Sequence, residues 1–115
     1  MLFRSAGAGT LTLTGNNTYT GATTINAGTL AISGGSAIAD SGTVILANTA
    51  GAVFSVNSSE TIASLQGGGS TGGNVTIASG QTLTVAEANT NSFNGTITGS
   101  GNLTKSGTEI GRAHV

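Results

Sequence analysis

Short β-type runs separated by small turn-forming residues make up almost the whole chain. Thr, Ile, Val and Leu alternate with small polar residues, as in Thr10-Leu11-Thr12-Leu13-Thr14, and Gly, Asn or Ser bounds each run. Alternation with period two predicts strands that bury one face, here with Leu11 and Leu13 inward, and helical periodicity is almost absent. Further strands are predicted at 22–25, 29–33, 43–47, 52–56, 61–65, 74–78, 82–86, 96–98 and 102–105. The sequence therefore predicts an all-β fold of short strands.

The apolar anchors of these runs recur at similar intervals. Ala8-Gly9-Thr10-Leu11 returns as Ala27-Gly28-Thr29-Leu30, and looser copies follow at 41–44, 80–83 and 101–103. Such spacing is typical of units that bury their inner faces only by stacking. Gly and Asn tolerate the backbone of sharp corners, so the prediction is a β-solenoid of about five coils, each roughly 20 residues long. The anchors are Leu11, Leu30, Val44, Leu65, Leu83 and Leu103.

Composition excludes several function classes. Only 6% of the 115 residues are charged, against about 25% in an average domain, and there is no Cys. Disulfides and thiolate metal sites are therefore excluded, and no cofactor or metal site is predicted. A net charge of −1 with three basic residues argues against nucleic acid and anionic membranes as partners. The scarcity of ionisable groups also argues against catalysis.

The two ends differ in character from the middle. Codons can be chosen for residues 1–5 whose reverse complement lies, in another frame, inside a stretch of codons for 109–115, so both ends resemble a translated sequencing adapter. We expect 1–5 and 109–115 to be non-native ends and 6–108 to be the biological segment. His114, the only histidine, lies in one of these ends.

Residues 9–30 resemble the autotransporter-associated β-strand repeat. Residues 99–107 resemble the lead-in to a further copy, and 31–98 are compatible with the same fold. The resemblance implies a right-handed parallel β-helix with uncapped ends, in the secreted passenger of a type V secretion autotransporter. It also suggests that Tyr19 packs against a neighbouring coil. The residues that carry the resemblance are Gly9, Leu11, Leu13, Gly15, Asn16, Tyr19, Gly21, Ile25, Asn26, Gly28 and Leu30.

The function implied by this resemblance is structural and non-enzymatic. The segment would be a stiff β-helical stalk that displays adhesion or self-association surfaces at the bacterial cell surface. Its partners would be the other coils of the parent passenger and the surfaces of host or neighbouring cells. The segment itself would not be embedded in a membrane, and a barrel outside it would anchor the parent protein in the outer membrane.

Three features carry alternative chemistry. Residues 67–72 match both a dinucleotide fingerprint and a nucleophile elbow around Ser70, but neither a following helix nor a partner His is predicted, which favours a loop. Asp40 and Glu60, spaced by about one predicted coil, could pair as in a polysaccharide-active β-helix enzyme. Together with Glu87, these acids are interpreted as solvated loop charges. Outward threonines at 10, 12, 14, 82 and 84 leave an ice-binding β-solenoid as the other alternative, and the favoured interpretation is the wet face of ordinary strands.

Overall fold

The computed structural model describes residues 3–5, 9–16, 21–34, 37–38, 42–86 and 93–105. Within these ranges the chain forms twelve strands and no helix, so no helix there could cross a membrane. The strands are β1 (Phe3–Ser5), β2 (Thr10–Leu13), β3 (Thr23–Ile25), β4 (Thr29–Ile32), β5 (Thr43–Leu46), β6 (Val53–Val56), β7 (Glu60–Ile62), β8 (Ser64–Gly67), β9 (Asn74–Ile77), β10 (Thr82–Val85), β11 (Ile97–Gly99) and β12 (Asn102–Lys105).

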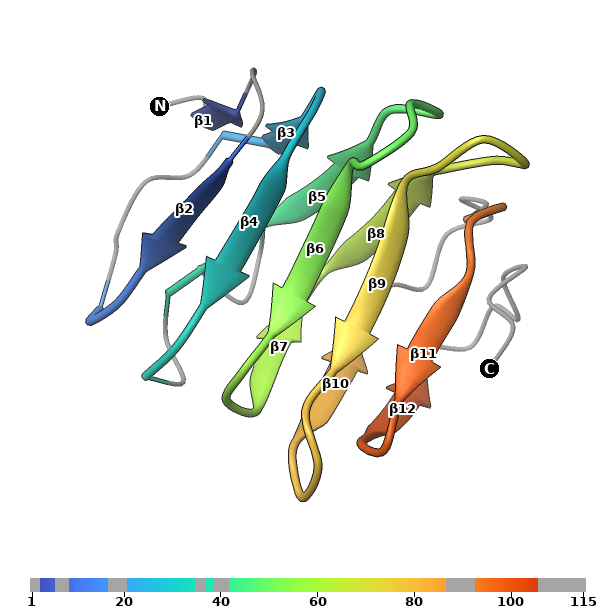
Figure 1. Cartoon of the computed structure of the whole chain (residues 1–115). Coiled ribbons are helices and arrows are strands. Elements are labelled where there is room, and N and C mark those ends of the chain that lie inside the picture. Colours follow the sequence, from blue (N-terminus) through green and yellow to red (C-terminus); the bar gives the residue numbers. More distant parts are fainter. Residues whose placement is uncertain are drawn as a thin grey trace.

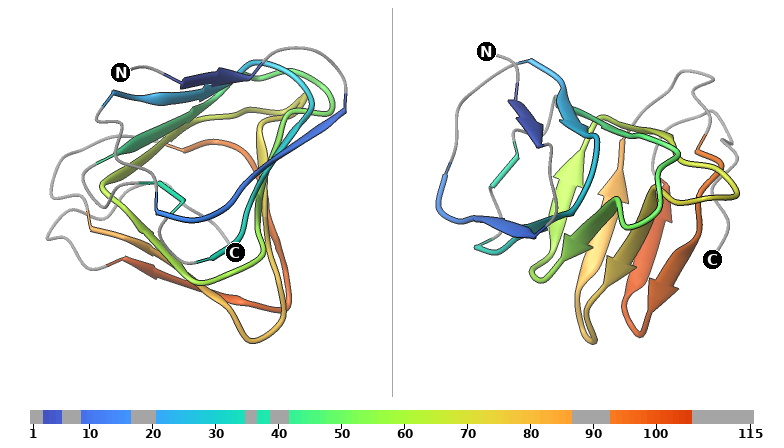
Figure 2. Two further views of the ribbon diagram at one scale, coloured as in Figure 1. Left: turned by 90° about the vertical axis from the view of Figure 1, so that its left-hand side faces the viewer. Right: turned by 45° about the horizontal axis from the view of Figure 1, so that its top comes forward.

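The strands build three parallel sheets that wrap around one core. The first sheet has the order β1-β3-β5-β8, the second β2-β4-β6-β9-β11, and the third β7-β10-β12. The chain visits the sheets in turn, so each strand pairs with its counterpart one coil later (Figure 1). The left view of Figure 2 shows the sheets as the sides of a column seen near its axis. The predicted parallel β-solenoid is confirmed, and its right-handed sense stays a prediction.

The number of coils agrees with the sequence prediction of about five. The five strands of the second sheet mark five successive coils, which are joined by four complete turns. Leu11 pairs with Leu30, and Leu30 pairs in turn with Phe54, which is a longer step along the chain. The length of a coil therefore varies along the column, because the corner loops differ in length.

The six apolar anchors do not form a single row. Leu11 and Leu30 pair in the second sheet, Val44 and Leu65 in the first, and Leu83 and Leu103 in the third. Each of these pairs spans one complete turn. The intervals between one pair and the next are steps from one sheet to another.

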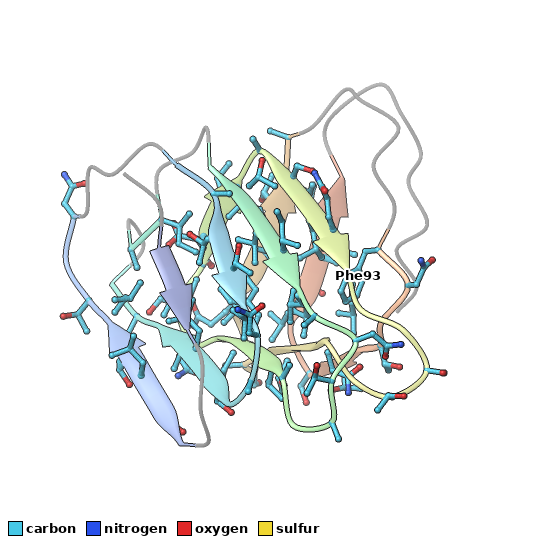
Figure 3. The ribbon with its side chains drawn as sticks, turned by 90° about the horizontal axis from the view of Figure 1, so that it is seen from above. Phe93 is labelled. Carbon is cyan, nitrogen blue, oxygen red and sulfur yellow. The ribbon has the colours of Figure 1, made fainter. Side chains whose placement is uncertain are left out.

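Inward-facing rows of apolar side chains fill the column. Each row runs across the coils, because paired residues in parallel strands point to the same face. In the second sheet Leu30, Phe54, Val75 and Ile97 form one such row and are at most 3% exposed. Phe93 extends the first sheet beyond β8 through a parallel bridge to Gly67, and its ring lies among the inward-pointing side chains (Figure 3).

The strand predictions hold with two differences. The run 61–65 was predicted as one strand, which is wrong, because the chain bends at Ala63 and passes from β7 in the third sheet to β8 in the first. The bend carries no Gly or Asn that would mark it. In addition, β1 forms at residues assigned to a non-native end and pairs with β3. The pairing of a three-residue strand does not show whether residues 1–5 are native. Residues 109–115 lie outside the described residues, so the domain boundaries stay predictions.

Leu11 departs from its predicted burial. It lies in the inward row, in register with Leu30, but it is 42% exposed and Leu13 is only partly buried. The reason is the place of β2 at the edge of the second sheet, where β4 covers one side of it and no strand among the described residues covers the other.

Candidate functional site

The repeat motif places its glycines at the corner that leads into the second sheet. Gly9 and Gly28 both have positive φ, at 112° and 72°, a conformation that glycine adopts without steric cost. Each carbonyl accepts a backbone N–H from the next coil, Gly9 from Thr29 at 2.8 Å and Gly28 from Val53 at 3.0 Å. The two copies of the Gly-Thr-Leu cue therefore stack directly on each other.

The other motif residues are divided between core and surface. Ile25 and Leu30 are fully buried, Gly21 and Asn26 are partly buried, and Gly15 and Asn16 are exposed. Tyr19 lies outside the described residues, so its packing stays a prediction. The motif thus specifies a corner and part of the core. Its described residues are Gly, Leu, Ile and Asn, none of which is an acid, a base or a nucleophile.

Two stacked loops project from the corner between the first and second sheets. The corner of the second coil covers only 26–28, whereas those of the next two coils are twice as long and cover 47–52 and 68–73 (Figure 1). The Asn48 side chain joins the two loops, because its Oδ1 accepts the backbone N–H of Thr71 at 2.8 Å and of Gly72 at 3.1 Å. One amide oxygen of loop 47–52 therefore holds loop 68–73 against it.

The glycine-rich segment 67–72 belongs to this stack. No helix follows it, since residues 68–73 form a loop that leads into β9, so the loop interpretation is confirmed. A Cβ at Gly72 would overlap the carbonyl oxygen of Thr49. Glycine at these positions allows the two loops to lie in close contact. The matches to the dinucleotide fingerprint and the nucleophile elbow are therefore coincidental.

A groove of about 410 Å³ lies where the short corner 26–28 meets the projecting loop 47–52. It spans three successive coils, and its walls are small side chains and backbone without a charged or aromatic group. Such a surface can hold a ligand by shape and by backbone hydrogen bonds. The lining residues are Gly9, Thr10, Ala27, Gly28, Thr29, Ala50 and Gly51.

Glu60 corrects the interpretation of the acids. It was expected to be a solvated loop charge, but it is 3% exposed on the inner face of β7, in register with Leu83. Its Oε2 accepts the backbone N–H of Ile38 at 3.0 Å. A carboxylate held in the core in this way does not line a surface where a polysaccharide could bind. Asp40 and Glu87 lie outside the described residues, within which no three acidic or histidine side chains gather as a metal site would require.

The threonines do not form one flat array. Thr10 and Thr12 lie in β2 of the second sheet, whereas Thr82 and Thr84 lie in β10 of the third. Among the described strands, the longest row that contains only threonines lies across the third sheet and consists of Thr61, Thr84 and Thr104. On the second sheet the row from Thr12 to Thr98 includes Ala31 and Ser55. The regular surface expected from five threonines is therefore divided between two sides of the column.

The fold and its corners define a repeat-built parallel β-solenoid. Residues 5–32 match the passenger-associated-transport-repeat family. The chain is also 44% identical, over 104 residues and 88% of its length, to the adhesin BmaC autotransporter of Brucella suis biovar 1 (strain 1330). It spans 3% of the length of that protein. No solved structure matches the chain. The chain therefore carries an autotransporter passenger repeat, as the sequence resemblance predicted.

Proposed function

We propose that the chain is a structural segment of a secreted autotransporter passenger, a β-solenoid stalk that presents a binding surface at the cell surface. The observation that supports a stalk is that each coil pairs with the next in at least two of the three parallel sheets. Backbone hydrogen bonds running along the column resist bending and stretching, because many must yield together. The similarity to an autotransporter adhesin supports the assignment of this segment to a secreted passenger.

The proposed adhesion surface is the corner formed by loops 47–52 and 68–73 with the groove beside them. The loops extend beyond the regular corner, and Ser70 and Thr71 at their outer part are exposed. Binding residues are commonly presented on loops held by a rigid scaffold, and here the Asn48 contacts supply that rigidity. The groove offers small, uncharged walls, which suit a polar, uncharged ligand such as a glycan chain.

Shortening one loop tests this proposal. The variant replaces residues 68–73 with Asn-Ala-Gly, the shorter corner of the second coil. A matched control, Ser79→Ala, alters an exposed residue at a different corner of the same coil. Binding to immobilised host-matrix glycoproteins and to polysaccharide-coated surfaces would be measured with a quartz crystal microbalance, and folding by circular dichroism. We expect the parent chain and the Ser79→Ala control to bind. The loop variant should fold but should not bind. Equal binding by all three would contradict the assignment of the surface.

A further inference from the structure

Loop 47–52 exposes more consecutive residues than any other corner in the middle of the column. Within the described residues of 21–86, the longest exposed run is 48–51, in this loop. Coils of the chain lie on both sides of it, so neither end of the chain determines its exposure. Exposed loops of small and polar residues are the preferred sites of proteolytic cleavage.

The loop is also long and weakly held. A protease binds its substrate as an extended segment of several residues, which a short corner fixed to two strands cannot supply. Corners 26–28, 57–59 and 78–81 are short, whereas 47–52 and 68–73 are longer. Loop 68–73 is held by the Asn48 side chain. Across 48–51, one backbone hydrogen bond forms among the described residues, from Ala52 N–H to the Thr49 carbonyl at 3.1 Å.

The residues near the loop restrict the class of protease that could cut it. Residues 42–86 include no Lys or Arg, and their one aromatic residue, Phe54, is fully buried. Trypsin-type proteases need a basic residue before the cut and chymotrypsin-type proteases a large apolar one, whereas elastase has a small pocket. The exposed Ala50 presents a single methyl group, which suits a small pocket.

We propose that loop 47–52 is a cleavage site for elastase-type proteases and that Ala50–Gly51 is the bond hydrolysed. The bond between the Ala50 carbonyl carbon and the Gly51 nitrogen breaks. Water supplies a hydroxyl to the Ala50 carbonyl and a proton to the Gly51 nitrogen, which leaves as an amine. This site depends on the backbone of the loop and not on the ligand proposed for the adhesion surface.

The column should stay assembled after this cut. Strand β5 precedes the cut and pairs with β8, which follows it. Strand β4 also precedes the cut and pairs with β6 beyond it. Two sheets therefore bridge the broken connection, and cleavage opens the projecting loop and one wall of the groove without dividing the column.

Limited digestion of the folded chain with pancreatic elastase tests the site. We expect the first cut at Ala50–Gly51, identified by mass spectrometry, and fragments that elute together on size exclusion until denaturant is added. A chain that resists elastase, or a first cut elsewhere within 42–86, would overturn the proposal. Separation of the fragments without denaturant would overturn the assembled column.

A gained trypsin site tests the accessibility of the loop separately from the pocket of the protease. The chain has no Lys or Arg between residues 5 and 104, so Ala50→Lys creates one internal trypsin site. Ser79→Lys is the matched control, because Ser79 is also exposed but lies in the shorter corner 78–81. Circular dichroism would verify that both variants fold. We expect trypsin to cut Ala50→Lys at least about tenfold faster, because cleavage follows the population of the open form. Equal rates would show that the loop is no more accessible than a tight corner and would overturn the proposal.

Discussion

The Glu60 carboxylate accepts the backbone N–H of Ile38 at 3.0 Å across one coil. Both residues are buried, and the contact lies where the third sheet begins at β7. Within the sheets a backbone carbonyl from the neighbouring coil receives such an N–H. The Glu60 side chain at the start of β7 therefore accepts from the preceding coil an N–H that a backbone carbonyl of the later coil accepts elsewhere.

Removing this carboxylate should destabilise the column. Glu60→Ala leaves the buried Ile38 amide without its acceptor, and an unsatisfied buried polar group costs about 1–3 kcal/mol. Urea unfolding followed by circular dichroism measures the loss. The control is Thr61→Ala on the outer face of the same strand, which should change stability by no more than about 0.5 kcal/mol. Equal effects of the two changes would contradict the assigned role.

Truncations along one inward row should depend on the coil. Phe54 is fully buried in mid-column, so Phe54→Ala should cost about 3–5 kcal/mol in free energy of unfolding. Leu11 lies in the same row at the open edge, so Leu11→Ala should cost only about 1 kcal/mol. Thermal and urea unfolding would measure both. A cost for Leu11→Ala as large as that for Phe54→Ala would mean that Leu11 is covered in solution.

Asn48 should control how firmly the projecting loops stack. Asn48→Ala removes the acceptor for the Thr71 and Gly72 amides, so both should exchange hydrogen faster, with a stability loss of about 1 kcal/mol. Hydrogen exchange read by NMR resolves the two amides. Asn57→Ala is the matched control, since that exposed amide oxygen accepts the hydroxyl of nearby Ser55 and joins no two loops. Unchanged exchange at both amides in Asn48→Ala would show that the loop is held by other contacts.

Replacing Gly72 with alanine, which adds a single methyl group, should destabilise the protein. Gly72→Ala drives a Cβ into the Thr49 carbonyl, and overpacking of this kind costs about 1–3 kcal/mol. Ser70→Ala, at the exposed part of the same loop, should stay within about 0.5 kcal/mol of the parent. Chemical unfolding would compare them. If Gly72→Ala were as stable as Ser70→Ala, the two loops would not be in close contact.

The fold could be predicted from the sequence because its signals are local. Alternation marked the strands, and the recurring Gly-Thr-Leu cue marked the stacked corner at Gly9 and Gly28. The assignment of anchors to sheets could not be predicted in the same way. Leu30 and Val44 look alike in sequence but lie in different sheets, because the lengths of the corners between them decide which strands pair.

The functional features were harder to predict because they depend on contacts between coils. Glu60 resembles any acid in a polar stretch, and its burial follows from its register with Leu83. Phe93 gave no signal beyond being aromatic, although it extends the first sheet into the last coil. The Asn48 contacts join residues on successive coils, and no local pattern marks that pairing.

The short reach of strand pairing has a consequence for folding kinetics. Each described strand pairs with the strand one turn away, and the step from Leu30 to Phe54 is among the longest of these separations along the chain. Each coil therefore closes a loop of similar length and similar entropic cost. Once two coils have formed, every later one docks onto an existing template. The column should therefore grow from a nucleus by successive addition, as in other linear repeat proteins, without a search for distant partners.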